Sequence, residues 1–236
     1  MKLLLSIITL IIAITIPAPA QTITLTPHRA HDALPLATAA GRSLLAPDAS
    51  LVFIGAIGND TYELNGMQIP LLFELDSGRA TAWVYQYYSP SLVKHVLIVA
   101  IDIPSMGFDA FEAQSPVPIP DLTQPLATDL PHAGSDRMIE RLKSDSVYQR
   151  YRADYPSARP ATLSYRPIII DDRLILPGDF PLEGTIWNLN FTGAGDATMT
   201  CYVDATTGRT FCLRSTNASS VPGEEREGRG MELSRK

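Results

Sequence analysis

Two stretches of this chain, far apart in the sequence, carry the same alternating pattern of large side chains. The first runs from Thr81 to Tyr87 and the second from Thr185 to Phe191, and each places a tryptophan two residues after its threonine. In both, the tryptophan, a large apolar residue or tyrosine, and an aromatic ring share alternate positions, as expected for a β-strand. Such a recurrence indicates an internal duplication. We therefore predict two related modules.

The first half is predicted to be a helix followed by strands. Apolar residues recur at helical spacing from Ala30 to Leu45, Asp32 is the expected N-cap, and Pro47 lies just beyond the end. Asn65-Gly66 favours a tight hairpin turn. The expected strands of this half are residues 51–57, 62–64, 67–73, 81–88 and 93–103.

The second half repeats this order. Ser135 is the expected N-cap of a helix that ends before Pro156, and a Pro-x-Ala motif follows the helix in both halves. One helix followed by antiparallel strands, twice, predicts an α+β fold in which each module packs a helix on an antiparallel β-sheet. The expected strands are residues 161–165, 168–170, 174–176, 185–191, 198–203 and 209–214.

Proline content marks the expected boundary between the modules. Six prolines fall between residues 104 and 132. They leave little room for regular structure, so we predict a linker at 104–132, between a first module at 21–103 and a second at 133–214. Phe108 and Phe111 within this range suggest that part of it packs on a module. Residues 215–236 are polar and glycine-containing, which predicts a disordered tail.

The first twenty residues have the order of a secretory signal peptide. A positive start at Lys2 is followed by an apolar run from Leu3 to Ile16 and by small residues ending at Ala20. We expect cleavage after Ala20, and hence a periplasmic or secreted protein. The alternative is an uncleaved anchor, but the apolar run is shorter than the ~20 residues of a spanning helix. No membrane span is expected after cleavage.

The charge of the chain limits its expected partners. Its 25 acidic side chains oppose 19 basic ones, for a net charge of −6. Nucleic acids and anionic lipids are polyanions, so a net acidic chain is poorly suited to bind either of them. An unknown protein or peptide is the partner that we expect.

The two cysteines, Cys201 and Cys212, lie in a predicted hairpin. The strands on either side of the turn at 204–208 place their sulfurs opposite each other or one register step apart, so a cross-strand disulfide is possible. An oxidising compartment favours such a bond. The alternative is a redox pair, but redox cysteines usually form a C-x-x-C motif at a helix start. We predict a structural disulfide.

Metal-binding spacing is weak throughout the chain. His28 and His31 could share a helix face with Asp32, but no third firm ligand is near. His95 lies alone in an apolar strand and His132 in the expected linker. We therefore assign no metal ligands.

Catalytic motifs are also missing from the sequence. It contains no Gly-x-Ser-x-Gly elbow, no phosphate-binding loop and no calcium loop, and both cysteines are expected to be paired. The Asp171-Asp172 pair is interpreted as a solvated loop. We assign no catalytic or cofactor-binding residues, expect no cofactor, and expect that the protein is not an enzyme.

The second half resembles a PepSY-type domain over Ser135 to Leu213. The resemblance rests on Tyr155-Pro156-Ser157-Ala158, on the strand around Trp187, and on Cys201-Tyr202-Val203-Asp204-Ala205-Thr206-Thr207-Gly208-Arg209, which is similar to the closing hairpin of that family. The first half shares the helix, Pro47-x-Ala49 and the Trp83 strand but lacks the Asp-Ala-x-Thr-Gly turn. The resemblance implies a helix on an antiparallel sheet in each module, and export. It also implies binding or restraint of peptidases, with no catalytic residues.

Two functions remain open from the sequence. The first is an exported, non-enzymatic binding or regulatory protein whose two small sheets take up an extended peptide at an exposed edge. The second is a carrier of a small apolar molecule, held in a cavity lined by the sheet aromatics around Trp83 and Trp187. Aromatic side chains at strand spacing are more often core than cavity lining, which favours the first.

Overall fold

A computed structural model describes residues 21–22, 24–58, 60–64, 67–113, 121–194 and 197–216 of the chain. The expected signal peptide at 1–20 and all but the first two residues of the expected tail lie outside these ranges. Within them the fold is α+β, with one large antiparallel sheet, two small sheets and four helices. The α+β prediction is confirmed at this level.

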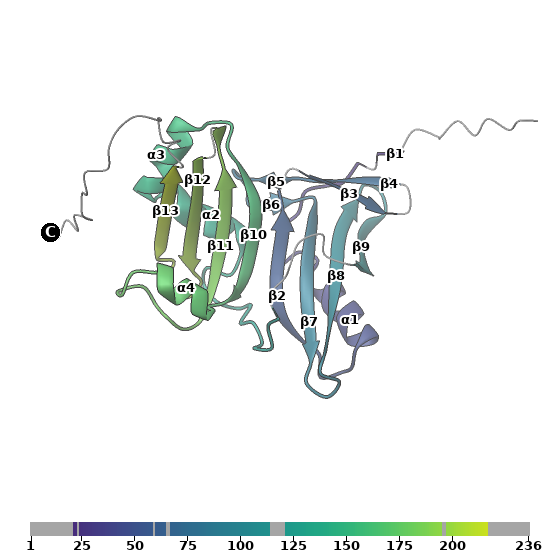
Figure 1. The fold of residues 1–236 in the computed structure, drawn as a ribbon. Helices are drawn as coiled ribbons and strands as arrows, with labels where there is room; N and C mark the ends of the chain where they lie inside the picture. Colours follow the sequence, from purple (N-terminus) through teal and green to yellow (C-terminus); the bar gives the residue numbers. More distant parts are fainter. Residues whose placement is uncertain are drawn as a thin grey trace, which may run out of the picture.

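One continuous eight-stranded antiparallel sheet runs through both halves of the chain (Figure 1). Strands β2 and β10 pair at its centre, with Leu163 opposite Ala56 and Tyr165 opposite Ile54. The expectation of two separate small sheets is therefore wrong, because the first strand of one half pairs with the first strand of the other. The order is β13 (Thr210–Thr216), β12 (Ala197–Asp204), β11 (Thr185–Thr192), β10 (Arg159–Pro167), β2 (Ser50–Ile57), β7 (Ala82–Ser89), β8 (Lys94–Ile103) and β9 (Gly107–Glu112).

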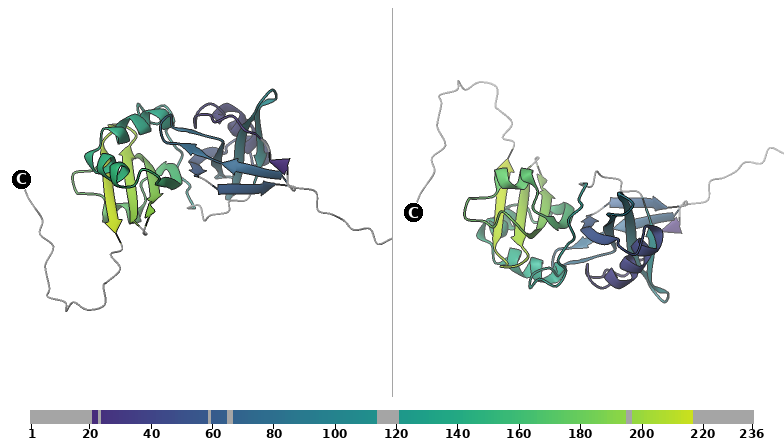
Figure 2. Two further views of the ribbon diagram at one scale, coloured as in Figure 1. Left: turned by 90° about the horizontal axis from the view of Figure 1, so that it is seen from above. Right: turned by 90° about the horizontal axis from the view of Figure 1, so that it is seen from below.

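Three helices cover one face of this sheet (Figures 1 and 2). Helix α1 (Leu34–Leu44) lies behind the first half, and α2 (Ser135–Lys143) and α3 (Ser146–Asp154) lie behind the second. The short hairpin of β5 (Phe73–Glu74) and β6 (Arg79–Ala80) adds Phe73, Leu75 and Ala80 to the same core. This face therefore holds one hydrophobic core that is shared by both halves.

The opposite face is covered by the segments that follow the first strand of each half. In the first half, Ile69 of β4 packs with Ala82 and Ile101 of the main sheet. In the second half, the short helix α4 and the loop after it bring Leu176 and Phe180 onto Ile186 and Tyr202. The elements on this face are β1 (Gln21–Thr22), β3 (Asp60–Leu64), β4 (Met67–Leu71) and α4 (Ile170–Ile175).

Trp83 and Trp187 lie in the middle of the shared core. Both are 0% exposed, and their rings meet edge to face at a centroid distance of 6.2 Å. Nε1 of Trp83 donates to the carbonyl oxygen of His28 (2.8 Å), and Nε1 of Trp187 donates to the carbonyl oxygen of His132 (3.1 Å). A buried indole N–H needs such a partner. Each tryptophan therefore fixes the segment that leads into the helix of its own half.

Several element boundaries differ from the sequence-based predictions. Helix α1 begins at Leu34, and Asp32 is not its cap, because the Asp32 carboxylate accepts the backbone N–H of Arg29 (2.8 Å) instead. The single helix predicted from Ser135 is two helices. Asp145 starts the second one by accepting the backbone N–H groups of Val147 and Tyr148 at 2.8 and 3.0 Å.

Two short strands predicted in the second half are not strands. Residues 168–169 have no regular structure, and residues 170–175 form helix α4, so the strand predicted at 174–176 is wrong. Within the range predicted as a linker, residues 107–112 form β9, which pairs with β8. Leu122 from the same range packs on Val52 and Phe53. Apolar side chains in this range thus find partners on the sheet despite the prolines nearby.

The predicted disulfide between Cys201 and Cys212 is present, with an S–S distance of 2.04 Å. The two residues are direct cross-strand partners of β12 and β13, and their Cα atoms are 4.1 Å apart. Both side chains belong to the shared core. The bond thus joins the last strand of the sheet to its neighbour.

We expect the protein to unfold in one cooperative transition, because both halves share a sheet and a core. Trp187→Phe should lower the free energy of unfolding of the whole protein by about 1–3 kcal/mol, since it removes the N–H that the His132 carbonyl oxygen accepts. Calorimetry tests the single transition, for which the calorimetric and van't Hoff enthalpies of unfolding should be equal. Trp83→Phe is the matched control and should shift the same transition. Two separate transitions would contradict the shared core.

Replacing Cys201 and Cys212 together by alanine should lower the free energy of unfolding by roughly 2–3 kcal/mol, because the unfolded chain loses a closed loop. Urea denaturation with the fluorescence of the buried tryptophans as the signal measures this. Wild-type protein in reductant is the control and should unfold near the midpoint of the double variant. An unchanged midpoint would show that the bond does not stabilise the sheet.

Candidate binding surface

The residues considered for metal binding do not form a metal site in the described part of the chain. No group of three or more His, Cys, Asp or Glu side chains is placed there to hold an ion. His28 pairs with Ala80 in an isolated bridge, and its ring packs edge to face on Phe108 at 5.0 Å. Burial lowers the pKa of His28 and of His31 from the usual 6.5. Both histidines therefore serve the packing of the N-terminal segment.

The other two histidines hold neighbouring segments in place. The ring of His95 has Nε2 at 2.8 Å from the carbonyl oxygen of Leu122 and Nδ1 at 3.2 Å from the Asp121 carboxylate. It thereby ties residues 121–122 to strand β8. Nε2 of His132 lies 3.4 Å from Nη2 of Arg141. Neither histidine faces a nucleophile among the described residues.

The sheet aromatics are packed against one another instead of lining a cavity. Tyr165 lies 4.8 Å from Trp187, and Phe73 lies 6.1 Å from Trp83, measured between ring centroids. Trp83, Trp187 and Tyr165 are all 0% exposed. The apolar carrier hypothesis thus loses the feature that motivated it, since the aromatic side chains already fill the space between sheet and helices.

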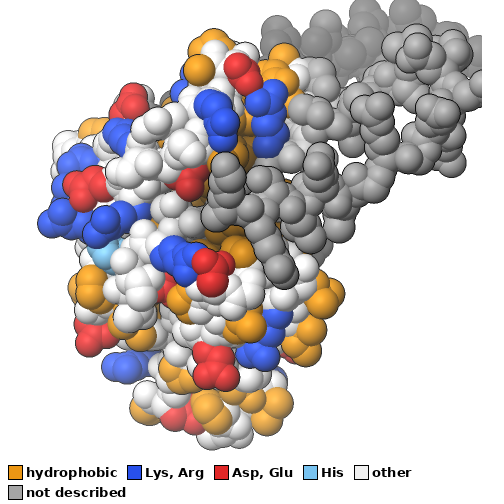
Figure 3. Space-filling model, turned by 90° about the vertical axis from the view of Figure 1, so that its left-hand side faces the viewer, with side chains coloured by type: hydrophobic (Ala, Val, Ile, Leu, Met, Phe, Trp, Pro, Cys, Tyr) orange, Lys and Arg blue, Asp and Glu red, His pale blue; other side chains and the backbone are white. Residues whose placement is uncertain are grey.

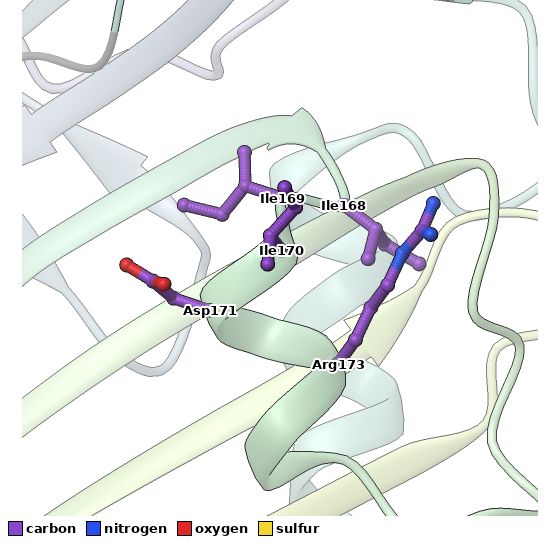
Figure 4. Close-up of a pocket in the computed structure, with 5 residues that line it drawn as sticks. All are labelled: Ile168, Ile169, Ile170, Asp171 and Arg173. Atoms are coloured by element: carbon purple, nitrogen blue, oxygen red, sulfur yellow. The ribbon is translucent and has the colours of Figure 1, made fainter.

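A shallow hollow lies beside helix α4 (Figure 4). It measures about 600 Å³ and is lined by Ile168, Ile169, Ile170, Asp171 and Arg173, which spread around the first turn of the helix. Ile170 and Leu174 are 76% and 82% exposed on this short helix. The hollow holds apolar side chains with one charge of each sign at its rim.

Helix α4 is held by a buried ion pair that the sequence did not suggest. Both Nη groups of Arg166 donate to the Asp172 carboxylate, at 2.5 and 2.8 Å, and the same carboxylate accepts the backbone N–H of Ile169 (2.9 Å). The two side chains are 8% and 3% exposed. The interpretation of Asp171-Asp172 as a solvated pair is therefore wrong for Asp172, whose partner is placed by the end of strand β10.

A second hollow, of about 370 Å³, lies between helix α3 and strand β13. Val147, Arg150 and Asp154 line it from the helix, and Arg214 lines it from the strand. Nη1 of Arg214 donates to the Asp154 carboxylate (2.6 Å), and Nη2 lies 3.1 Å from the Tyr155 hydroxyl. Helix α3 lies beside β13, the last strand of the main sheet (Figure 1).

The two outer strands of the main sheet, β9 and β13, have one neighbour each. Just before β13, the backbone N–H of Asp204 donates to the carbonyl of Arg209 (2.9 Å), so the backbone groups of Arg209 face inward, toward β12. Inward and outward residues alternate in an antiparallel pair, which turns the backbone N–H and C=O of Thr210, Cys212 and Arg214 outward. In an antiparallel pair, opposite residues that are not hydrogen-bonded to each other have the shorter Cα distance. The distance of 4.1 Å between Cys201 and Cys212 therefore agrees with an outward orientation of the Cys212 backbone groups.

The outward backbone groups of β13 have no other backbone partner among the described residues. An edge of this kind is a template for a further strand. The sequence predicts an exposed edge but does not identify β13 as that edge, because this depends on which strand comes last in the sheet. One signal was available in the sequence: Arg214 lies two residues after Cys212 in the predicted strand and therefore shares its face.

No family model, no curated protein and no solved structure matches this chain. In the described part of the chain, every helix is too short or too polar to cross a lipid bilayer.

Asp172→Ala should lower the free energy of unfolding by about 3–5 kcal/mol, because it leaves the Arg166 guanidinium buried without a partner. Asp171→Ala removes an equal charge from the exposed neighbouring position and should change stability by no more than about 0.5 kcal/mol. Urea denaturation of both variants compares them. Equal effects would contradict a structural role for the buried pair.

Proposed function

We propose that this chain is an exported binding protein without catalytic activity, built from two PepSY-like modules, which takes up an extended peptide segment of a partner protein. The observation that carries the proposal is the open edge of the main sheet at β13, where the outward backbone N–H and C=O groups have no backbone partner among the described residues. Strand addition needs only such an edge and a segment that lies alongside it.

Support for the duplication comes from the shared order of elements. Each half runs from a helix or helix pair to a strand, then to a segment that covers the opposite face, then to three antiparallel strands. The equivalent first strands, β2 and β10, meet at the centre of the sheet. In both halves the hydrogen bond from the tryptophan spans 55 residues back along the chain, from Trp83 to His28 and from Trp187 to His132. Equal separations in the two halves are what a duplication would produce, and they support a common origin.

Support for export comes from the N-terminal sequence and from the disulfide. The charged, apolar and small-residue order of residues 1–20 is that of a signal peptide. The Cys201–Cys212 bond persists in an oxidising compartment such as the periplasm or the exterior. The non-enzymatic part of the proposal rests on the missing catalytic motifs in the sequence.

Selection of random dodecapeptides against the purified protein tests the function. We expect binders with alternating side-chain character, and we expect them to slow amide hydrogen exchange along an outer strand of the main sheet. A helix-forming peptide of the same composition is the control and should not bind. Failure to select any peptide, or protection confined to the helices, would contradict the proposal.

A further inference from the structure

We infer that the β13 edge and the hollow beside helix α3 form one binding site for an extended segment in which acidic and apolar side chains alternate. This inference rests on the proposed function and names the edge and the chemistry of the bound segment.

The opposite edge of the sheet is partly closed by its own residues. The backbone N–H of Ala113 donates to the carbonyl of Leu97 (3.0 Å), so by alternation the N–H of Ala110 points outward. The Asp109 carboxylate accepts that N–H at 2.9 Å. Asp109 and Glu112 also place two negative charges on this strand. An edge strand resists strand addition when it carries charged side chains and when its own side chains already bond its outward backbone groups. This leaves β13 as the open edge of the main sheet.

Strand β13 is held firmly in place for a partner. The disulfide joins Cys212 to β12, Oγ1 of Thr210 donates to the Asp145 carboxylate (2.9 Å), and Arg214 is bound to Asp154 (2.6 Å). These three residues are the ones whose backbone groups point outward. A preorganised edge loses little conformational entropy when a strand binds.

The side chains of the bound strand would meet two different surroundings. A residue directly opposite Cys212 or Arg214 would point to the helix side of the sheet, because cross-strand partners share a face. On that side lies the hollow lined by Val147, Arg150, Asp154 and Arg214. A residue opposite Leu213 would point to the other side, where Leu213 is 49% exposed and Phe211 is half-buried.

The hollow carries an unbalanced positive charge. Arg214 is paired with Asp154, whereas Arg150 forms no ion pair with any described residue and only its Nε donates, to the carbonyl of Ser146 (3.3 Å). Lys and Arg side chains occur in several groups over the upper half of the face that contains this edge (Figure 3). The whole chain is acidic, with a net charge of −6, whereas two arginines and one aspartate line this hollow. Arginine pairs well with carboxylates, which predicts glutamate or aspartate at the positions that enter the hollow.

The occupant is therefore an extended acidic segment of another protein, with apolar residues at the intervening positions. We expect it to lie antiparallel to β13, since every pairing in the main sheet is antiparallel and such pairs are slightly more stable than parallel ones. In that arrangement the acidic residues lie opposite the outward residues of β13. Their backbone N–H groups would thus donate to the sheet, and those of the apolar residues would face solvent.

A capped heptapeptide of alternating valine and glutamate is the probe, with fluorescence anisotropy as the readout on the full purified protein. We expect it to bind, and to slow amide exchange at Thr210, Cys212 and Arg214. The same peptide with lysine in place of glutamate should bind at least about fivefold more weakly at low salt, and the difference should shrink at high salt.

Backbone methylation separates strand addition from simple charge attraction. N-methylation of the glutamates should abolish binding, because it removes the donors that face β13, whereas N-methylation of the valines should be tolerated. Equal loss for both peptides would overturn the predicted pairing. When the same number of residues is methylated in each, both peptides have the same charge and mass, so each is the control for the other.

Variants test the hollow itself. Arg150→Glu should weaken binding of the glutamate peptide by roughly five- to tenfold, and Arg150→Lys should largely restore it. Arg173→Glu makes the same charge change within α4, in the other hollow. It is the matched control and should leave binding unchanged. Circular dichroism confirms that each variant is folded.

The outcomes separate this inference from the proposed function. Binding that is equal for glutamate and lysine peptides, or unaffected by Arg150→Glu, would overturn the acidic specificity while strand addition stands. Protection of β9 instead of β13, or a new dimer of the protein on the same edge without peptide, would overturn the site. If no peptide of any sequence binds, including those from the random selection, the proposed function itself fails.

Discussion

The pairing of strand β2 with strand β10 determines where every other part of the sheet lies. Leu163 opposite Ala56 and Tyr165 opposite Ile54 bring the first strands of both halves together along their lengths. Each half alone would have had an exposed edge at this strand, and the pairing removes both edges at once. The two that remain are β9 and β13, at opposite ends of one long sheet. The distribution of open backbone groups follows from that single contact.

The shared core strengthens the joint between the halves. Trp83 and Trp187 approach each other across the junction, and both are fully buried. Two large aromatic side chains in contact remove much apolar surface from water, which is the dominant stabilising term in folding. The halves therefore belong to one cooperative unit, although the order of elements in each supports a common origin. Such a joint would give the proposed binding edge a rigid support.

Both faces of the main sheet are covered, so its unpaired backbone groups lie at its two edges. The helices and the β5–β6 hairpin cover one face, and the segments after β2 and β10 cover much of the other. Arg166 and Asp172 lock the second of these segments at the cost of burying two charges. The apolar turn of α4 and the hollow beside β13, which two arginines line, are both exposed. Only the second combines open backbone groups, a hollow and an unpaired charge.

Local patterns in the sequence determined much of the secondary structure. Alternation around Trp83 and Trp187 predicted strands, helical spacing predicted α1, and the hairpin chemistry at 201–212 predicted a disulfide, because these features depend on residues close in sequence. The short elements were less predictable. Residues 168–170 and 174–176 are apolar and were predicted as short strands, but residues 170–175 form a helix, since Asp172 satisfies both Arg166 and the helix start.

The candidate site was decided only by the tertiary structure. Arg150 and Arg214 lie far apart along the chain, and nothing local to either residue indicates that they line one hollow. Which strand becomes an edge depends on strand order, and strand order depends on long-range pairing between β2 and β10. The sequence by itself thus determined most of the long strands, the region of the main helices and the disulfide through short-range periodicity and turn chemistry. The open edge and its charge required the whole sheet, because hydrogen bonding between distant strands decides which backbone groups stay free.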